Sequence, residues 1–361
     1  MKLFRNMQLK PKLISLFLFA GLVPLVLIGF LVSHLVTNTL MDRSFDQFLL
    51  SQSTKKKQIE TYFKQQVKDL KILANSRDVA ELYHDLSLYH DRFGNSSDVS
   101  FPLSDSEYKR LHSSYRDFFT HYINTFAYRE IFVICAAHGH VMFTLNNRFA
   151  AGANLQYGKH NKSNLAKLWQ TVKKRRDFVF TDFDSDPLSN EKETAYIGYP
   201  FYDDQGHLSG VVALQMTPET INQIMDSRDG MGETGETYLI AYDQQSRRYE
   251  FRSDMKTMGA GQYVIGKSIT PLSYWRDAFD ETKEASGKGL YVDSEKKEVL
   301  IGYDRVDIPD VNWALISKID KAEVTAPILK LLNSIFMVGL FLLLGMAVIS
   351  YLLSRSISRP I

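Results

Sequence analysis

The stretch GMGETG, residues 230–235, has the G-x-G-x-x-G spacing of glycines that hold a dinucleotide. In such a site the glycines follow a strand and open a helix, so that the phosphates meet the helix N-terminus. Here a helical stretch, PETINQIM, precedes the glycines and a β-type stretch, ETYLIAYD, follows them. This order argues against a dinucleotide cofactor, and we interpret the glycines as a turn that enters a strand.

The stretch DFDSDPLSNEKE places Asp182, Asp184, Asp186 and Glu193 at positions 1, 3, 5 and 12 of a calcium-binding loop. Carboxylate oxygens at that spacing can surround Ca²⁺. However, Pro187 takes the sixth position, where glycine makes the sharp turn that the loop needs. No helical hairpin flanks the stretch, so we interpret it as a polar loop between strands.

His138 and His140 flank Gly139 at the tip of a predicted β-hairpin, where two imidazoles can bind a metal weakly. No third ligand stands at a suitable spacing, so the sequence favours a solvated turn. A Ser-His-Asp set, a nucleophile elbow and a P-loop are likewise not recognisable. We therefore predict no catalytic residues, no metal site and no cofactor.

Composition excludes several classes of protein. The 361 residues carry a formal net charge of +2, and this near balance gives no indication of a nucleic-acid partner. The single cysteine, Cys135, excludes an intrachain disulfide. At about 150 residues per domain, the length predicts about two domains.

Two uncharged apolar stretches, residues 13–38 and 331–354, are each long enough to cross a membrane as a helix. The first is too long for the apolar part of a signal peptide, and no small-residue cleavage site follows it. Basic residues flank the outer ends of both stretches, within residues 1–12 and 355–361. The positive-inside bias therefore predicts two cytoplasmic ends and an external segment over residues 39–330.

The external segment begins with a predicted helix over residues 40–78 that continues the first span. Its apolar stripe, Ile59, Tyr62, Phe63, Gln66 and Leu70, recurs at steps of three and four residues. We predict that this stripe joins two copies in a parallel homodimer.

Two similar sets of elements follow that helix. A helical stripe over residues 108–122 precedes hairpin-forming β-type runs, a helix at NLAKLW and further strands, among them a hairpin at DDQG. A shorter version of this plan recurs after residues 225–235. The predicted fold is α+β, with a distal module over about 79–225 and a proximal module over about 226–320.

The chain resembles the double Cache sensory region of bacterial methyl-accepting chemotaxis proteins and related transmembrane sensors. The resemblance rests on KKKQIETYFKQQVKDLKILA in the stalk, GYPFYDDQGHLSGVVALQM closing the distal module, GMGETGETYLIAYD opening the proximal one, NWALISKID before the second span, and SRSISRPI, which is similar to the start of a HAMP linker. It implies two PAS-like antiparallel modules in a receptor of the bacterial inner membrane, with the sensor domain in the periplasm.

The resemblance also implies a function. The chain would bind a small molecule outside the membrane and transmit the signal through the second span to a HAMP and output module, in chemotaxis. Its partners would be the ligand, the membrane, a second copy and cytoplasmic signalling proteins. The input region of a sensor histidine kinase or diguanylate cyclase, and a scaffold that binds no ligand, remain the alternatives.

The ligand site is expected in the distal module, near Tyr157, Asn164, Asp182, Tyr196 and Gln215. Gln215 takes the position where amino-acid receptors of this fold carry an aspartate, and their Arg-x-Trp-Tyr stretch is missing. Strand alternation places Gln215 with Val211 and Ala213 on one face. A buried polar side chain without a partner costs about 1–3 kcal/mol, so Gln215 faces water, a ligand or an internal partner. The alternative is a ligand site in the proximal module, around Tyr238 and Asp243.

Overall fold

A computed structural model of the chain describes residues 9–93, 100–146, 150–189, 192–228, 230–244, 246–255 and 265–358. Residues 1–8 of the predicted cytoplasmic N-terminus and residues 359–361 of the predicted HAMP segment lie outside the described residues.

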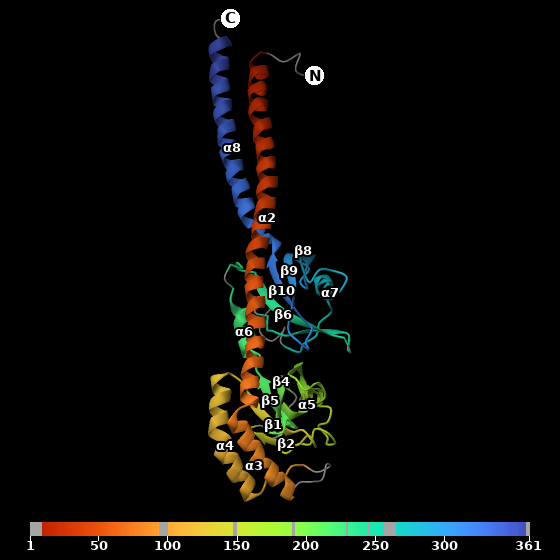
Figure 1. The fold of residues 1–361 in the computed structure, drawn as a ribbon. Coiled ribbons are helices and arrows are strands. Elements are labelled where there is room, and N and C mark those ends of the chain that lie inside the picture. The colour runs from red at the N-terminus through yellow and green to blue at the C-terminus, as the bar shows by residue number, and fades with distance from the viewer. Residues whose placement is uncertain are drawn as a thin grey trace.

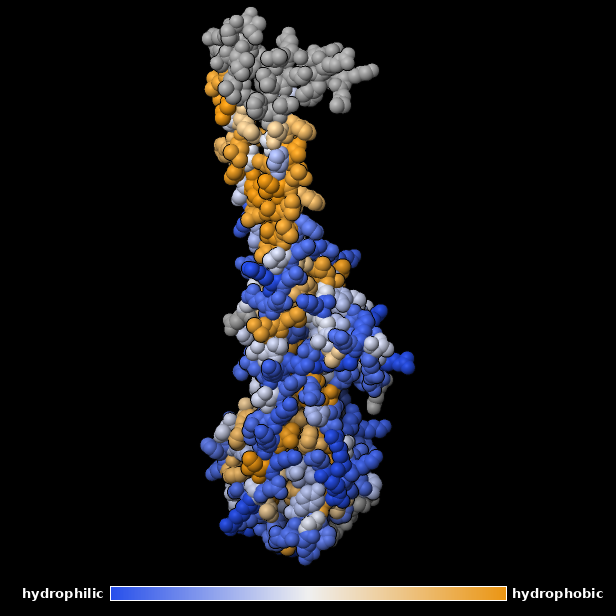
Figure 2. All heavy atoms as spheres, turned by 45° about the horizontal axis from the view of Figure 1, so that its top comes forward, coloured by the Kyte–Doolittle hydropathy of each residue, from blue (hydrophilic) through white to orange (hydrophobic). Residues whose placement is uncertain are grey.

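One helix runs along the whole molecule. Helix α2 (Leu9–Ala74) has 66 residues, so the prediction that one helix continues from the first apolar stretch is confirmed, although the helix ends four residues before the predicted residue 78. Helix α8 (Lys321–Ser358) lies beside its N-terminal half (Figure 1). Both helices are long and apolar enough to cross a membrane. Figure 2 shows their apolar side chains gathered beyond the two modules.

The apolar stripe of α2 faces the chain's own modules. Ile59 and Leu70 are fully buried. Phe63 packs edge-on against Phe180 and Trp313, with ring centroids 5.0 and 5.4 Å apart. The prediction that this stripe forms a dimer interface is therefore wrong, because one chain already covers it; dimerisation itself stays a prediction.

The distal module is built on a five-stranded antiparallel sheet in the order β2-β1-β5-β4-β3. Its strands are β1 (Glu130–Cys135), β2 (Val141–Thr144), β3 (Val179–Asp186), β4 (Lys192–Tyr202) and β5 (Leu208–Met216). Helices α3 (Arg77–Phe93) and α4 (Ser106–Thr125) lie with α2 on one face, and α5 (Asn164–Arg175) covers the other. A short 3₁₀ turn, η1 (Pro187–Ser189), joins β3 to β4.

Alternation along β5 divides the distal core in two. Val212 and Leu214 pack in the cluster that contains α2, α3 and α4, whereas Val211 and Ala213 pack under α5. Because successive side chains point to opposite faces, Gln215 shares the α5-covered face, as predicted.

The proximal module repeats this topology. Its five-stranded antiparallel sheet has the order β7-β6-β10-β9-β8. The strands are β6 (Glu236–Asp243), β7 (Arg248–Phe251), β8 (Ser286–Val292), β9 (Glu298–Val306) and β10 (Trp313–Asp320). Helix α6 (Glu219–Asp226) leads into the module, and α7 (Ser273–Phe279) packs on its sheet. The predicted α+β fold with two antiparallel modules is confirmed.

The glycine-rich loop before β6 lies against the start of α8. Gly230 and Gly232 take positive φ angles of 75° and 72°, which glycine adopts without strain. The Glu323 carboxylate, in the first turn of α8, accepts hydrogen bonds from the backbone N–H of Glu233 at 2.7 Å and of Thr234 at 2.8 Å. The interpretation of this motif as a turn into a strand is confirmed, and the turn also holds α8.

Candidate functional site

The middle of helix α5 lies directly on strand β4 of the distal sheet. A Cβ atom on Gly198 of β4 would approach Leu168 Cδ2 to 2.8 Å, so the helix and strand meet this closely only because residue 198 is glycine. Trp169 is buried beside them, and its indole Nε1 donates to the carbonyl of Cys135 at 3.0 Å. This part of the α5-covered face is filled by the chain's own apolar side chains.

Polar side chains gather at the N-terminal end of α5, where η1 meets β4 and β5. We call Asn164, Asp186, Ser189, Tyr196 and Gln215 the distal polar cluster. Ser189 is its centre, because its hydroxyl lies 3.2 Å from the Tyr196 hydroxyl and accepts from Gln215 Nε2 at 3.1 Å. Asn164 Nδ2 donates to backbone carbonyls of β3 and β4 at 2.9 and 2.7 Å.

The only carboxylate in this cluster belongs to Asp186, which is fully buried. It accepts from the backbone N–H of Leu188 at 2.9 Å. Burial raises the pKa of Asp186, although hydrogen bonds from Leu188 and Tyr196 oppose the shift. The cluster therefore combines neutral hydrogen-bonding groups with one carboxyl group held away from water.

His160 lies within the electrostatic reach of Asp186, in the loop that precedes α5. Its Nδ1 is buried and has no hydrogen-bond partner among the described residues. Burial lowers the pKa of His160, Lys159 lowers it further, and the Asp186 carboxylate opposes the shift. An unpaired buried ring nitrogen costs free energy, so His160 is a candidate to bind an added polar molecule.

Three of the five predicted site residues come together: Asn164, Tyr196 and Gln215 belong to the distal polar cluster. Tyr157 does not, because its side chain is 57% exposed and bonds the neighbouring Gln156. Asp182 directs its carboxylate to the proximal module instead.

Asp182 joins the two modules. Its Oδ1 accepts from Arg252 Nε at 2.7 Å and from the indole Nε1 of Trp313 at 3.0 Å. Arg252 is only 2% exposed and also donates to Glu250 at 3.1 Å. A second link pairs Arg175 with Asp310. No local sequence pattern indicates the pairing of Asp182 with Arg252.

Sequence reasoning missed Asp186, Ser189 and His160 as site residues. Asp186 had appeared only as part of a calcium-like spacing, but the acidic side chains of that stretch diverge. Asp182 pairs with Arg252, whereas Asp184 is exposed and pairs with Lys167 at 3.1 Å. The segment is strand β3 followed by η1, rather than the polar loop that was predicted.

The alternative site residues in the proximal module do not converge. Tyr238 is buried in an aromatic core, where its hydroxyl accepts from Trp275 Nε1 at 3.1 Å and lies 3.4 Å from the Tyr274 hydroxyl. Asp243 is exposed at the end of β6 and bonds Ser246 in the turn.

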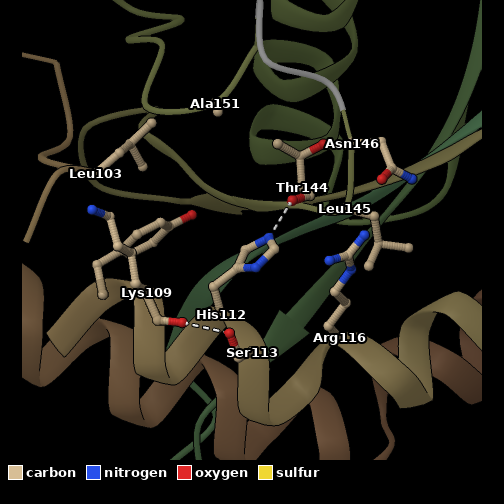
Figure 3. A pocket seen from close by; sticks show the side chains of 10 residues that line it. Leu103, Lys109, His112, Ser113, Arg116, Thr144, Leu145, Asn146 and Ala151 are labelled. Atoms are coloured by element: carbon tan, nitrogen blue, oxygen red, sulfur yellow. Dashed lines mark hydrogen bonds between the residues drawn. The ribbon is translucent and has the colours of Figure 1, made fainter. Parts of the chain in front are cut away.

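An open groove lies on the other face of the distal module, between α4 and the end of β2 (Figure 3). Its volume is about 610 Å³, which is in the range of small-molecule pockets. Lys109 and Arg116 are the charged residues among its described lining, and His112 Nε2 lies 2.9 Å from the Thr144 carbonyl. The groove suits an anionic group better than a cationic one.

The fold consists of two antiparallel modules of the same strand order along one long helix. The chain matches the family model of the Cache domain (dCache_1) over residues 36–328. It therefore belongs to the Cache-domain family. No curated protein matches the sequence.

Solved structures align with this chain at low sequence identity. The ligand-binding domain of Campylobacter jejuni chemoreceptor Tlp3, in complex with L-valine, aligns with a TM-score of 0.50 and 10% identity over 80% of this chain and 97% of that chain. The ligand-binding domain of Pseudomonas fluorescens chemoreceptor CtaA, in complex with L-serine, aligns with a TM-score of 0.46 and 12% identity. The alignment covers 77% of this chain and 99% of that chain. An extracellular ligand binding receptor from Desulfohalobium retbaense aligns with a TM-score of 0.43 and 14% identity. The alignment covers 75% of this chain and 40% of that chain.

Proposed function

We propose that the chain is the input region of a transmembrane chemoreceptor that binds a small polar molecule outside the cytoplasmic membrane. The distal polar cluster carries this proposal, because it places neutral polar groups and a buried carboxyl group on one face of the membrane-distal sheet. Membership in the Cache family and the two apolar helices support it.

The cluster suits a ligand that donates hydrogen bonds. Asp186 and the side-chain oxygens of Gln215 and Asn164 are acceptors, and Ser189 and Tyr196 can both donate and accept. An amine or a polyhydroxylated molecule fits this set. Such a ligand would replace the bonds of Ser189 to Tyr196 and Gln215, and would displace η1 from the ends of β4 and β5.

A displacement of η1 could be transmitted to α8 through strands β3 and β10. Strand β3 ends where η1 begins, and β3 also carries Asp182, which bonds Trp313 at the first residue of β10. Strand β10 ends at Asp320, and α8 begins at the next residue. We infer that a shift of β3 moves β10 and thereby α8, the predicted second span.

A thermal-shift screen of the full chain in detergent tests ligand binding, with amines, amino acids, sugars and organic acids as probes. A ligand at 100 times its Kd stabilises the folded state by about 2.7 kcal/mol, a rise in Tm of several degrees. For the compound that gives such a rise, Gln215→Ala should weaken binding about tenfold or more, since 1.4 kcal/mol corresponds to a factor of ten.

Gln205→Ala is the matched control, because Gln205 is an exposed glutamine in the β4–β5 turn of the same module. It should bind as the unmodified chain does. Unchanged binding by Gln215→Ala together with loss of binding by Asp243→Ala would place the ligand in the proximal module and refute the distal site.

A further inference from the structure

Three histidines from two separate segments meet in the distal module. His90 lies near the end of α3, and His138 and His140 flank Gly139 in the β1–β2 turn. One ring nitrogen of each lies within 4.8 Å of those of the other two. The prediction of a solvated turn without a third ligand is wrong, because His140 is fully buried and α3 brings His90 to it.

The three rings are packed together, and those of His90 and His140 have little contact with solvent. His90 stacks on His138, with ring centroids 5.3 Å apart, and on Phe101 at 5.8 Å. His90 and Phe101 are 4% and 3% exposed. The Nδ1 of His138 is buried and lacks a hydrogen-bond partner among the described residues. An unpaired buried nitrogen beside two other imidazoles is a costly arrangement unless another group binds there.

The orientation of the Asn154 side chain determines which ring nitrogen of His140 carries the proton. Its Oδ1 accepts from the backbone N–H of Gln156 and Tyr157, both at 2.9 Å, so its Nδ2 faces His140 Nε2 at 3.1 Å. His140 Nε2 is then the acceptor, and His140 Nδ1 carries the proton. That proton is donated to His90 Nε2 at 2.9 Å. His140 therefore donates a hydrogen bond to His90 Nε2 and accepts one from Asn154 Nδ2.

We propose that His90, His138 and His140 bind a divalent transition-metal ion, such as Zn²⁺, Ni²⁺, Cu²⁺ or Co²⁺. Imidazole nitrogen is a preferred ligand of these ions, whereas Ca²⁺ and Mg²⁺ prefer oxygen. Three histidines leave a fourth tetrahedral position for water or a small ligand. This site lies apart from the distal polar cluster and does not depend on the proposed function.

The geometry requires only a small adjustment. Zinc–nitrogen bonds of about 2.0–2.1 Å place tetrahedral ligand nitrogens about 3.4 Å apart. The His90–His140 pair at 2.9 Å would open slightly, and the remaining separations, which reach at most 4.8 Å, would close by ring rotation. His138 is the least buried of the three and gives the ion access from solvent.

Asn154 sets the affinity of this site. Coordination through His140 Nδ1 would move the ring proton to Nε2, which faces the Nδ2 donor of Asn154. Asn154→Asp has the same shape and keeps one oxygen for the backbone N–H groups of Gln156 and Tyr157. Its second oxygen accepts the proton of His140 Nε2, as carboxylates do beside metal-bound histidines. This variant should therefore bind metal more tightly.

Metal titration of the full chain tests the proposal. The protein is purified in detergent without a polyhistidine tag, stripped with a chelator, and titrated with Co²⁺ and then with Zn²⁺. We expect one ion per chain, with the visible absorption bands of tetrahedral Co²⁺ and their loss when Zn²⁺ displaces it. His90→Gln and His138→Gln should each lower the affinity at least tenfold, and Asn154→Asp should raise it by about tenfold.

His84→Gln is the matched control, because His84 is an exposed histidine on the same helix, α3. It should leave both affinity and spectrum unchanged. The gain expected for Asn154→Asp cannot arise from misfolding, so the proposal stays testable if a histidine variant is unstable. Absence of stoichiometric binding, or equal binding by the His138→Gln and His84→Gln variants, would overturn the metal site and leave the three histidines a structural cluster.

Discussion

Replacing Asp182 by alanine should weaken the junction between the two modules. The change removes the carboxylate that accepts from Arg252 Nε at 2.7 Å and from Trp313 Nε1 at 3.0 Å. Arg252 is 2% exposed, so its guanidinium cannot recover a hydration shell without movement of the modules. The variant leaves a buried charge that has lost its principal partner.

The expected loss in free energy of unfolding follows from how much of this ion pair is buried. Breaking a fully buried ion pair costs about 3–5 kcal/mol. Two features reduce the cost here: the Asp182 side chain is 29% exposed, and Glu250 still accepts from Arg252 at 3.1 Å. We therefore expect a loss of about 1.5–3 kcal/mol, close to that of a hydrogen bond to a charged group. At about 2–4 °C per kcal/mol, Tm should fall by roughly 3–12 °C.

Thermal unfolding of the full chain in detergent, followed by tryptophan fluorescence, measures this loss. A double-mutant cycle with Arg252→Met isolates the pair, because without the guanidinium Asp182→Ala should cost only the hydrogen bond from Trp313 Nε1. Asp204→Ala is the control, since Asp204 is exposed in the β4–β5 turn. An equal loss with and without Arg252, or no loss beyond that of Asp204→Ala, would show that the ion pair does not hold the modules together.

Three further predictions concern α2, α8 and the membrane. Alkaline phosphatase fused at Gly206 should be active, whereas activity of a cytoplasmic reporter at that position would reverse the topology. Leu50 and Ile72 are 69% and 71% exposed on α2, so a cysteine at either position should crosslink two chains in membranes. A cysteine at buried Ile59 should not crosslink. Equal crosslinking at all three positions would contradict a dimer through the exposed face of α2. Glu323→Ala removes the acceptor of two backbone N–H groups in the glycine-rich loop, so hydrogen exchange of these groups should accelerate. Unchanged exchange would show that Glu323 does not hold this loop against α8.

Local patterns were sufficient to predict most of the elements. The three- and four-residue stripe predicted the part of α2 that follows the first apolar stretch, and the alternation of β5 correctly placed Gln215 on the face of Val211 and Ala213. Both patterns depend on neighbours within one helix or strand, where the repeat of the backbone fixes which side chains share a face. The repeated element order likewise predicted two antiparallel modules, and the structure shows that their sheets have the same strand order.

Contacts between distant segments could not be predicted in this way. The stripe around Ile59 had no sequence signal that its partner was the same chain rather than a second copy. The pairing of Asp182 with Arg252, and of His90 with His140, depends on how α3 and the two sheets pack in three dimensions. Periodicity shows that a residue is covered, but it does not identify what covers it.

The tightly packed core of the proximal module suits it to transmit a shift from the distal module to α8. The face of the proximal sheet that α7 covers contains Tyr238, Tyr274 and Trp275, which are nearly completely buried and joined by hydrogen bonds, so this core is a stiff unit. Strand β10 lies inside its sheet and is hydrogen-bonded along its length to β6 and β9. A strand held on both sides cannot change register without breaking both ladders, so we expect it to move as a rigid element. At about 3.3 Å per residue, β10 spans roughly 26 Å from the module junction to the start of α8. A shift of about 1–2 Å at the distal end, which is the usual scale for packed elements, would therefore reach α8 with little loss.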